Sequence, residues 1–258
     1  MTRGQPFPKL EHPVAVPLAD TFVAPALLDQ EKGRAAIGHA VRDGFLRPFD
    51  IARAEIEEPL PLWVPFWRVA VSVDGFHLTV SSVNVGKDGR PVPIPSGGAR
   101  YKDAFVMMCA RTAFPYEPKM SSLFGRVSGA LPLEVGTDEL TSPAVPEMLA
   151  ENGAVVLDAD VDRARAESAA MGLLLHGVSP THAIYETFEP KIEGASFCLY
   201  PIYFARYAYE GEARRHPGES LFVAVSGRTG QVVAAKHPSA VRSVAAKVRR
   251  LLSFDRRT

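Results

Sequence analysis

Two stretches of the chain share prolines, aromatic residues and an acidic-glycine pair at the same spacing. They are Trp63-Val-Pro-Phe-Trp-Arg-Val-Ala-Val-Ser-Val-Asp-Gly75 and Leu199-Tyr-Pro-Ile-Tyr-Phe-Ala-Arg-Tyr-Ala-Tyr-Glu-Gly211. Pro65 corresponds to Pro201 and Gly75 to Gly211, both at a shift of 136 residues (201 − 65 and 211 − 75). A fixed shift without gaps indicates an internal repeat. The alternative is two unrelated edge strands of similar composition.

The sequence around each stretch predicts the same series of elements. A helix is expected over residues 29–43, capped by Asp29, and another from Asp158 or Asp160 to about Leu175, because an aspartate accepts hydrogen bonds from the first free N–H groups of a helix. Asp74-Gly75 lies between two apolar runs and predicts a hairpin turn. Residues 91–98 are rich in proline and glycine and predict a loop.

These elements predict an α+β fold. It consists of two repeated helix-plus-antiparallel-sheet units, in tandem or sharing one sheet, followed by a C-terminal amphipathic helix. The predicted organisation is an extended proline-rich arm at 1–28, a first α+β unit at 29–145, a second at 146–238 and a basic helix at 239–258.

Charge and hydropathy restrict the partners and the compartment. The net charge is +0 and the pI about 7.1, so no overall field attracts nucleic acid. No run of 18 apolar residues is present, and the first residues lack the apolar core of a signal peptide. The sequence therefore predicts a cytoplasmic protein, with peripheral contact to a membrane as an option.

Residues that carry catalysis or bind metals do not form a pattern. The two cysteines, Cys109 and Cys198, lie in apolar surroundings that favour free thiols, and the seven histidines are scattered without ligand spacing. No serine lies in a nucleophile elbow and neither cysteine has a histidine beside it. We therefore expect no metal and no cofactor, and the sequence favours a protein that is not an enzyme.

Two blocks resemble a bacterial family often labelled zinc-ribbon or helicase-like, which is itself essentially uncharacterised. Trp63-Val-Pro-Phe-Trp67 is similar to its YIPFW block. Leu199-Tyr-Pro-Ile-Tyr203 with Phe222-Val-Ala-Val-Ser-Gly-Arg-Thr-Gly-Gln-Val-Val233 is similar to its LLPVW…NGQTGKVVG block. The family's four-cysteine ribbon is absent here, and Ser226 and Arg228 replace its Asn and Gln. The chain ends in a basic helix where many relatives continue into membrane segments. The resemblance bears on fold more than on function.

The hairpin at Thr229-Gly-Gln-Val-Val233 also looks like a strand pair of PepSY-type modules, which bind or inhibit rather than catalyse. Its turn, Ser226-Gly-Arg-Thr-Gly230, offers two interpretations. Backbone N–H groups with Arg228 can hold an anion, or the glycines can supply positive φ angles to an ordinary hairpin turn. The turn lacks the Lys-Ser/Thr and the following helix of a phosphate-binding loop.

The aromatic residues of the two stretches are candidates for a ligand site. On a strand, Tyr203 and Tyr207 share one face and Arg206 lies on the other. Tyrosine combines apolar area with a polar tip, so a pocket lined by Trp67, Tyr203, Arg206 and Tyr207 is a hypothesis for a small ligand. The alternative is ordinary core packing.

The last twenty residues form the other candidate. Their apolar residues fall at helical spacing on one face: Val241, Val244, Ala245, Val248, Leu251 and Leu252. The basic residues around them are Arg242, Lys247, Arg249, Arg250, Arg256 and Arg257. A basic amphipathic helix is typical of contact with an acidic protein or an anionic membrane, although it can also pack on its own sheet.

The sequence therefore favours a binding or assembly protein that acts through its C-terminal helix. A small-ligand protein or enzyme with a pocket between the two units is the alternative hypothesis.

Overall fold

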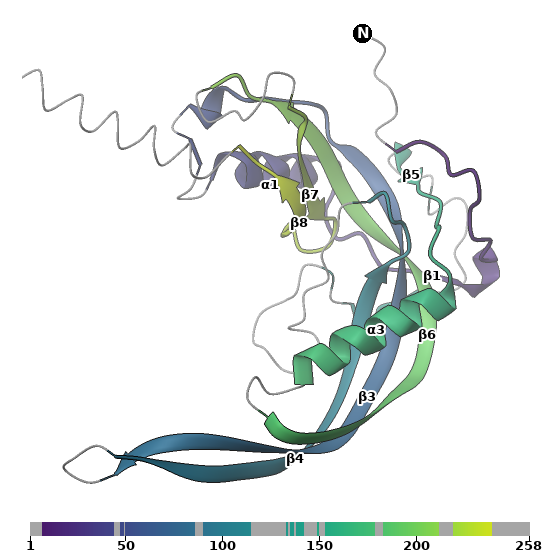
Figure 1. The fold of residues 1–258 in the computed structure, drawn as a ribbon. Coiled ribbons are helices and arrows are strands. Elements are labelled where there is room, and N and C mark those ends of the chain that lie inside the picture. Colours follow the sequence, from purple (N-terminus) through teal and green to yellow (C-terminus); the bar gives the residue numbers. More distant parts are fainter. Residues whose placement is uncertain are drawn as a thin grey trace, which may run out of the picture.

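The structure is a computed structural model of residues 1–258 (Figure 1). It describes residues 7–43, 47–48, 50–85, 90–114, 133, 135–136, 138–141, 149, 153–178, 183–211 and 219–238.

One mostly antiparallel sheet dominates the fold. Its main path runs in the order β4-β3-β6-β7-β8. These strands are β3 (Leu60–Val85), β4 (Arg90–Cys109), β6 (Ala183–Ala208), β7 (Leu221–Ser226) and β8 (Val232–Lys236). Three short strands join the central pair: β1 (Thr21–Val23) and β2 (Glu55–Ile56) on β6, and β5 (Val155–Val156) on β3.

Two α-helices cover the same face of this sheet, at its two ends (Figure 1). Helix α1 (Gln30–Arg42) packs on Tyr203 and its neighbours, and helix α3 (Arg163–Val178) packs on Trp67 and its neighbours. The two contact residues share a face because Trp67 pairs with Phe197, an even number of residues from Tyr203 on β6. Two short 3-10 helices, η1 (Leu18–Asp20) and η2 (Ile51–Arg53), complete the described elements.

Each helix begins at an aspartate. The Asp29 carboxylate accepts the Lys32 N–H at 2.8 Å, as the sequence predicted. Asp162, rather than Asp158 or Asp160, accepts the Arg165 N–H at 2.8 Å and caps α3. Capping side chains of this kind typically contribute about 1 kcal/mol.

The predicted fold class is wrong: the protein is predominantly β and does not consist of two repeated helix-plus-sheet units. The predicted turn at Asp74-Gly75 is the interior of β3, a strand of 26 residues. Gly75 is needed there for a close approach, since a Cβ would lie 2.4 Å from both the Phe188 side chain and the Thr187 carbonyl oxygen.

The predicted loop at 91–98 is also wrong, because it belongs to β4. Pro91, Pro93 and Pro95 are tolerated there because β4 is the edge of the sheet and pairs only with β3. A proline on an edge strand can face its missing N–H away from the ladder without losing a hydrogen bond.

The two Pro-aromatic stretches lie side by side at the centre of the sheet. They run antiparallel, with Val64 opposite Tyr200 and Pro65 opposite Leu199. Each proline carbonyl accepts one corresponding hydrogen bond: from the Ala110 N–H to Pro65 at 2.9 Å, and from the Gly227 N–H to Pro201 at 2.8 Å. We use the names Pro65 crossing and Pro201 crossing for the residues around these two hydrogen bonds.

The aromatic residue two positions after each proline is held in the same way. The Trp67 indole N–H donates to the Val161 carbonyl at 2.8 Å, and the Tyr203 hydroxyl donates to the Leu28 carbonyl at 3.0 Å. Both acceptors directly precede the capping aspartate of a helix. The crossings are therefore related by an approximate local two-fold axis between Val64 and Tyr200.

Candidate functional site

The four residues predicted to bind a ligand do not come together in the described part of the chain. Trp67 belongs to the core under α3, while Tyr203 and Tyr207 belong to the core under α1. Arg206 is half-buried and lies on the opposite face of β6. Trp67 and Tyr203 use their polar atoms on backbone carbonyls, so both act as core residues here.

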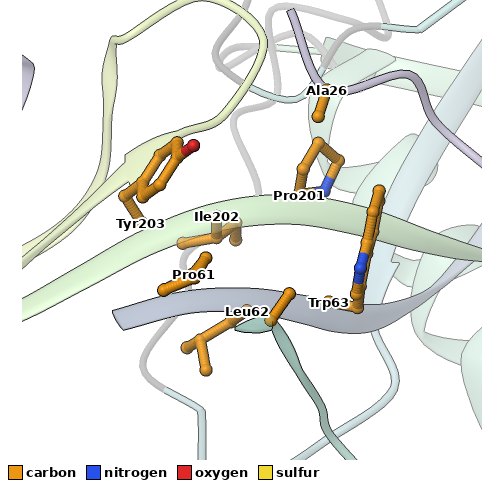
Figure 2. A pocket seen from close by; sticks show the side chains of 8 residues that line it. Ala26, Pro61, Leu62, Trp63, Pro201, Ile202 and Tyr203 are labelled. Carbon is orange, nitrogen blue, oxygen red and sulfur yellow. The ribbon is translucent and has the colours of Figure 1, made fainter. Parts of the chain in front are cut away.

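A small pocket opens beside the paired residues 61–63 of β3 and 201–203 of β6 (Figure 2). Its volume of about 40 Å³ has room for a few water molecules and not for a metabolite. The indole N–H of Trp63 donates to the Leu149 carbonyl at 3.1 Å. Only Tyr203 carries a titratable group among the residues lining it, which are Ala26, Pro61, Leu62, Trp63, Ala154, Pro201, Ile202 and Tyr203. The hydroxyl of that tyrosine donates to the Leu28 carbonyl at 3.0 Å.

The turn between β7 and β8 forms a polar cluster with internal partners. Ser226 Oγ accepts the N–H groups of Arg228 and Thr229, both at 3.1 Å, and lies 2.9 Å from the Tyr200 hydroxyl. Burial raises the pKa of Tyr200 to about 12. Since Ser226 accepts these two N–H groups, they are not free to hold an anion.

The same turn places Arg228 against a carboxylate. Arg228 is 9% exposed, and its Nη2 donates to Glu139 Oε1 at 2.6 Å. The Gly136 N–H and the Arg228 guanidinium lower the pKa of Glu139. Of the two glycines in this turn, Gly227 and Gly230, only Gly230 has a positive φ, of 70°. Gly227 instead allows a close approach, because a Cβ there would lie 2.9 Å from the Pro201 side chain.

A second polar cluster closes the far end of β8. His237 Nε2 lies 2.6 Å from Arg47 Nη2, and His237 Nδ1 lies 2.8 Å from the Tyr207 hydroxyl. Burial, followed by the charge of Arg47, lowers the pKa of His237 to about 4, so the ring is neutral at pH 7. Because Arg47 can only donate, Nε2 accepts and the proton sits on Nδ1, donating to Tyr207. Tyr207 in turn donates to the Lys236 carbonyl at 3.3 Å.

The two thiols are free and unreactive. Phe66 pairs with Cys198 on one side and with Cys109 on the other, so a whole strand separates the two sulfur atoms. Burial raises the pKa of each thiol to about 12, which leaves almost no thiolate at neutral pH. The described residues also contain no cluster of His, Cys, Asp or Glu able to hold a metal ion.

The most conspicuous exposed feature is the end of the β3–β4 ladder. Pairing between β3 and β6 stops at Thr79 and Ala183, but β3 and β4 stay paired as far as Val85 and Arg90. We call residues 76–85 and 90–99 the projecting hairpin; its two-stranded part, 80–85 and 90–95, lies beyond the end of β6 and extends away from β8 (Figure 1). No described residue forms a layer over this two-stranded part, so both of its faces are open to a partner.

Both faces of the projecting hairpin expose apolar residues: Val83, Val92 and Ile94 lie on one, and the other continues across β6. Cross-strand partners point to the same face, so Leu78 shares it with Tyr185, and Val80 with Pro95. Phe76 is 42%, Val80 39% and Tyr185 56% exposed. We define the hairpin face as Phe76, Leu78, Val80, Pro93, Pro95 and Tyr185. Large exposed apolar groups gathered on one surface mark interaction sites more often than isolated ones do.

Two carboxylates border the hairpin face. Asp74 and Glu189 are exposed and lie directly opposite each other on β3 and β6. Among the described residues neither forms an ion pair. Like charges at opposed positions destabilise a sheet, so this end of the surface attracts a cation.

Sequence reasoning missed this surface because Asp74-Gly75 suggested that β3 ended there. The alternation of Phe76, Leu78 and Val80 was the available signal. The six basic residues predicted to contact a partner lie outside the described residues: Arg242, Lys247, Arg249, Arg250, Arg256 and Arg257.

Comparison with known proteins gave no match to a family model, a curated protein or a solved structure. The resemblance to the zinc-ribbon or helicase-like family and to PepSY-type modules therefore stays a prediction. Within the part of the chain that the structure describes, no helix is long and apolar enough to cross a membrane.

Proposed function

We propose that the chain is a non-catalytic binding or assembly protein and that the hairpin face receives a second protein chain. The observation that carries the proposal is the exposed apolar surface at this end of the sheet: β3 and β4 remain paired beyond β6, and Phe76, Val80 and Tyr185 are exposed there. Exposing these side chains costs free energy, at about 25 cal/mol per Å² of apolar area left in water. A partner that covers the face recovers this free energy.

The edge of the hairpin restricts the mode of contact. Pro91, Pro93 and Pro95 remove three N–H donors at alternating positions of β4. Addition of a further strand at this edge needs those donors, so strand addition is disfavoured. A partner is expected to pack on the face, with side-chain contacts.

Site-specific photo-crosslinking in the native cell tests this proposal. A photoreactive phenylalanine analogue replaces Val80 or Tyr185, and a control chain carries it at Leu27, another exposed apolar side chain at 59% exposure. We expect discrete protein adducts from Val80 and Tyr185 and none from Leu27. An absence of adducts at both hairpin positions, in a chain that is folded and abundant, contradicts the proposal.

A further inference from the structure

We infer that the occupant of the hairpin face is the C-terminal segment, residues 239–258, of another copy of this chain. This inference rests on the proposed function and names the partner of the same surface. It follows from the chemistry of the two surfaces and from their positions in the molecule.

The two surfaces are complementary in polarity and charge. The hairpin face is apolar and is bordered by the carboxylates of Asp74 and Glu189. The C-terminal segment combines apolar residues at helical spacing with six arginine and lysine residues and one acidic residue, Asp255. An amphipathic helix of this kind places its apolar side on the hairpin and its cations near the carboxylates.

Geometry makes the contact intermolecular. The C-terminal segment starts beside His237, which lies against Tyr207 at one end of β6. The hairpin face begins near Tyr185, 22 residues away along the same strand (207 − 185), or about 70 Å at roughly 3.3 Å per residue. A twenty-residue helix is only about 30 Å long. Figure 1 shows the hairpin and β8 at opposite ends of the curved sheet, so we assign the contact to the hairpin of a neighbouring copy.

Such a contact joins two different surfaces, so it is head-to-tail. Heterologous contacts of this kind build rings or open chains, and their extent depends on protein concentration. The account therefore predicts self-association of the purified full-length chain that weakens as salt is added, because salt screens the Arg–carboxylate attraction.

Analytical ultracentrifugation of full-length variants tests the inference. Val80→Lys disrupts the hairpin face and Leu251→Asp disrupts the apolar side of the C-terminal segment. Each is expected to weaken self-association at least tenfold. The control Leu27→Lys changes a still more exposed apolar residue elsewhere and is expected to associate like the wild type.

The decisive arm of the experiment mixes the two defective variants. The Val80→Lys chain keeps a functional C-terminal segment and the Leu251→Asp chain keeps a functional hairpin face. Their equimolar mixture is expected to form a 1:1 complex that grows no further. A wild type that stays monomeric at every concentration overturns the inference, as does a mixture that stays monomeric or a Leu251→Asp chain that associates normally.

Two checks separate binding from folding. Circular dichroism reports whether Val80→Lys is folded, and Tyr185→Lys replaces it if it is not. Asp74→Asn with Glu189→Gln removes the like-charge pair, so it is expected to raise the unfolding midpoint while weakening association several-fold. If the two carboxylates had only a structural role, the unfolding midpoint and the strength of self-association would change in the same direction.

Failure of the inference and failure of the proposed function are distinguishable. A monomeric chain whose hairpin crosslinks to a different protein in the cell removes the self-assembly inference and leaves the proposed function in place. A monomeric chain with no hairpin adducts removes both.

Discussion

The Pro65 and Pro201 crossings share the same pattern of backbone hydrogen bonds and differ in the strands that lie beside them. At each crossing the proline carbonyl accepts one N–H, from Ala110 or Gly227, at 2.8 to 2.9 Å. The carbonyl of that donor residue then accepts two successive N–H groups, from Asp160 and Val161 or from Leu27 and Leu28. The shared part is a hydrogen-bonded framework in the core.

The strands beside the two crossings differ in length. Beside the Pro65 crossing, β3 pairs with the 20 residues of β4 and projects as a hairpin, whereas beside the Pro201 crossing, β6 pairs with the 6 residues of β7. The comparison indicates that the framework supplies stability, whereas the extension on the Pro65 side carries the exposed apolar residues of the hairpin face. The stability of substituted variants measures how far the two crossings are equivalent and whether the extension is separate from the core.

The largest difference in stability between the two crossings is expected when the arginine that follows each donor residue is replaced. Arg111 is 1% exposed, and its Nη1 and Nη2 donate to the carbonyls of Asp158 and Pro8. Arg111→Ala leaves a cavity in place of a fully buried side chain and removes both hydrogen bonds, at a cost of about 3 kcal/mol. Arg228→Ala releases Glu139, whose side chain is 42% exposed and can be hydrated, at a cost of about 1 kcal/mol. Urea unfolding of both variants measures the difference, and equal losses contradict it.

The donor residue itself gives the next largest contrast. In Gly227→Ala the new Cβ meets the Pro201 side chain at 2.9 Å and the Pro201 carbonyl oxygen at 3.0 Å, so we expect a loss of about 2 kcal/mol. The Pro65 crossing accommodates Ala110 in the same role, and Ala110→Gly is expected to cost less than about 1 kcal/mol. Thermal unfolding of the two variants decides, and a neutral Gly227→Ala means that the crossings are more alike than the structure indicates.

Removing the aromatic hydrogen bond is expected to affect both crossings about equally. Tyr203→Phe and Trp67→Phe each remove one donor to a backbone carbonyl, worth about 1 kcal/mol. The tryptophan change also removes some packing, so its loss is slightly larger. Chemical denaturation provides the measurement, and a loss confined to one side breaks the equivalence.

Lowering the pH is expected to destabilise the Pro201 side first, because His237 becomes protonated. Its folded pKa of about 4 lies below the roughly 6.5 of an unfolded chain, so the unfolded chain binds the proton more readily. The stability contributed by the neutral ring is complete above pH 6.5 and is lost as the pH falls toward 4. The His237→Gln variant should lose less stability than the wild type across this window. Parallel curves for the two proteins contradict the role of His237.

The smallest effect on stability is expected on the hairpin. Val80→Ser changes an exposed side chain outside the cores, so the unfolding free energy should change by no more than about 0.5 kcal/mol. A loss above about 2 kcal/mol would show that the hairpin belongs to the core, and would remove the distinction between framework and extension.

Local sequence rules predicted several elements and missed their arrangement. Asp29 marked the start of α1, and the Ser226–Gly230 turn between two strands was predicted correctly, because capping and turn chemistry depend on near neighbours. Asp74-Gly75 misled because the need for glycine there comes from Phe188, more than a hundred residues away. The prolines of β4 misled because the sequence does not say which strand forms the edge.

The candidate site was the harder part. Tyr203 and Trp67 were predicted as ligand residues, but distant carbonyls of Leu28 and Val161 occupy their polar atoms. The hairpin face depends on where β6 stops pairing, which no local pattern reveals. The relation between the Pro65 and Pro201 stretches, in contrast, was visible as a shared spacing, and the structure places the two stretches beside each other.

Native-state hydrogen exchange on the full-length chain, at a dilution where it is monomeric, measures directly whether the projecting hairpin is separate from the hydrogen-bonded framework of the two crossings. The account predicts that the Ala110 and Gly227 amides exchange at similar, slow rates, because each donates to a proline carbonyl at the centre of the sheet. It predicts that the amides of residues 80–83 exchange much faster and slow down when the chain is concentrated enough to assemble. Equal protection of the hairpin and the two crossings in the monomer would contradict it.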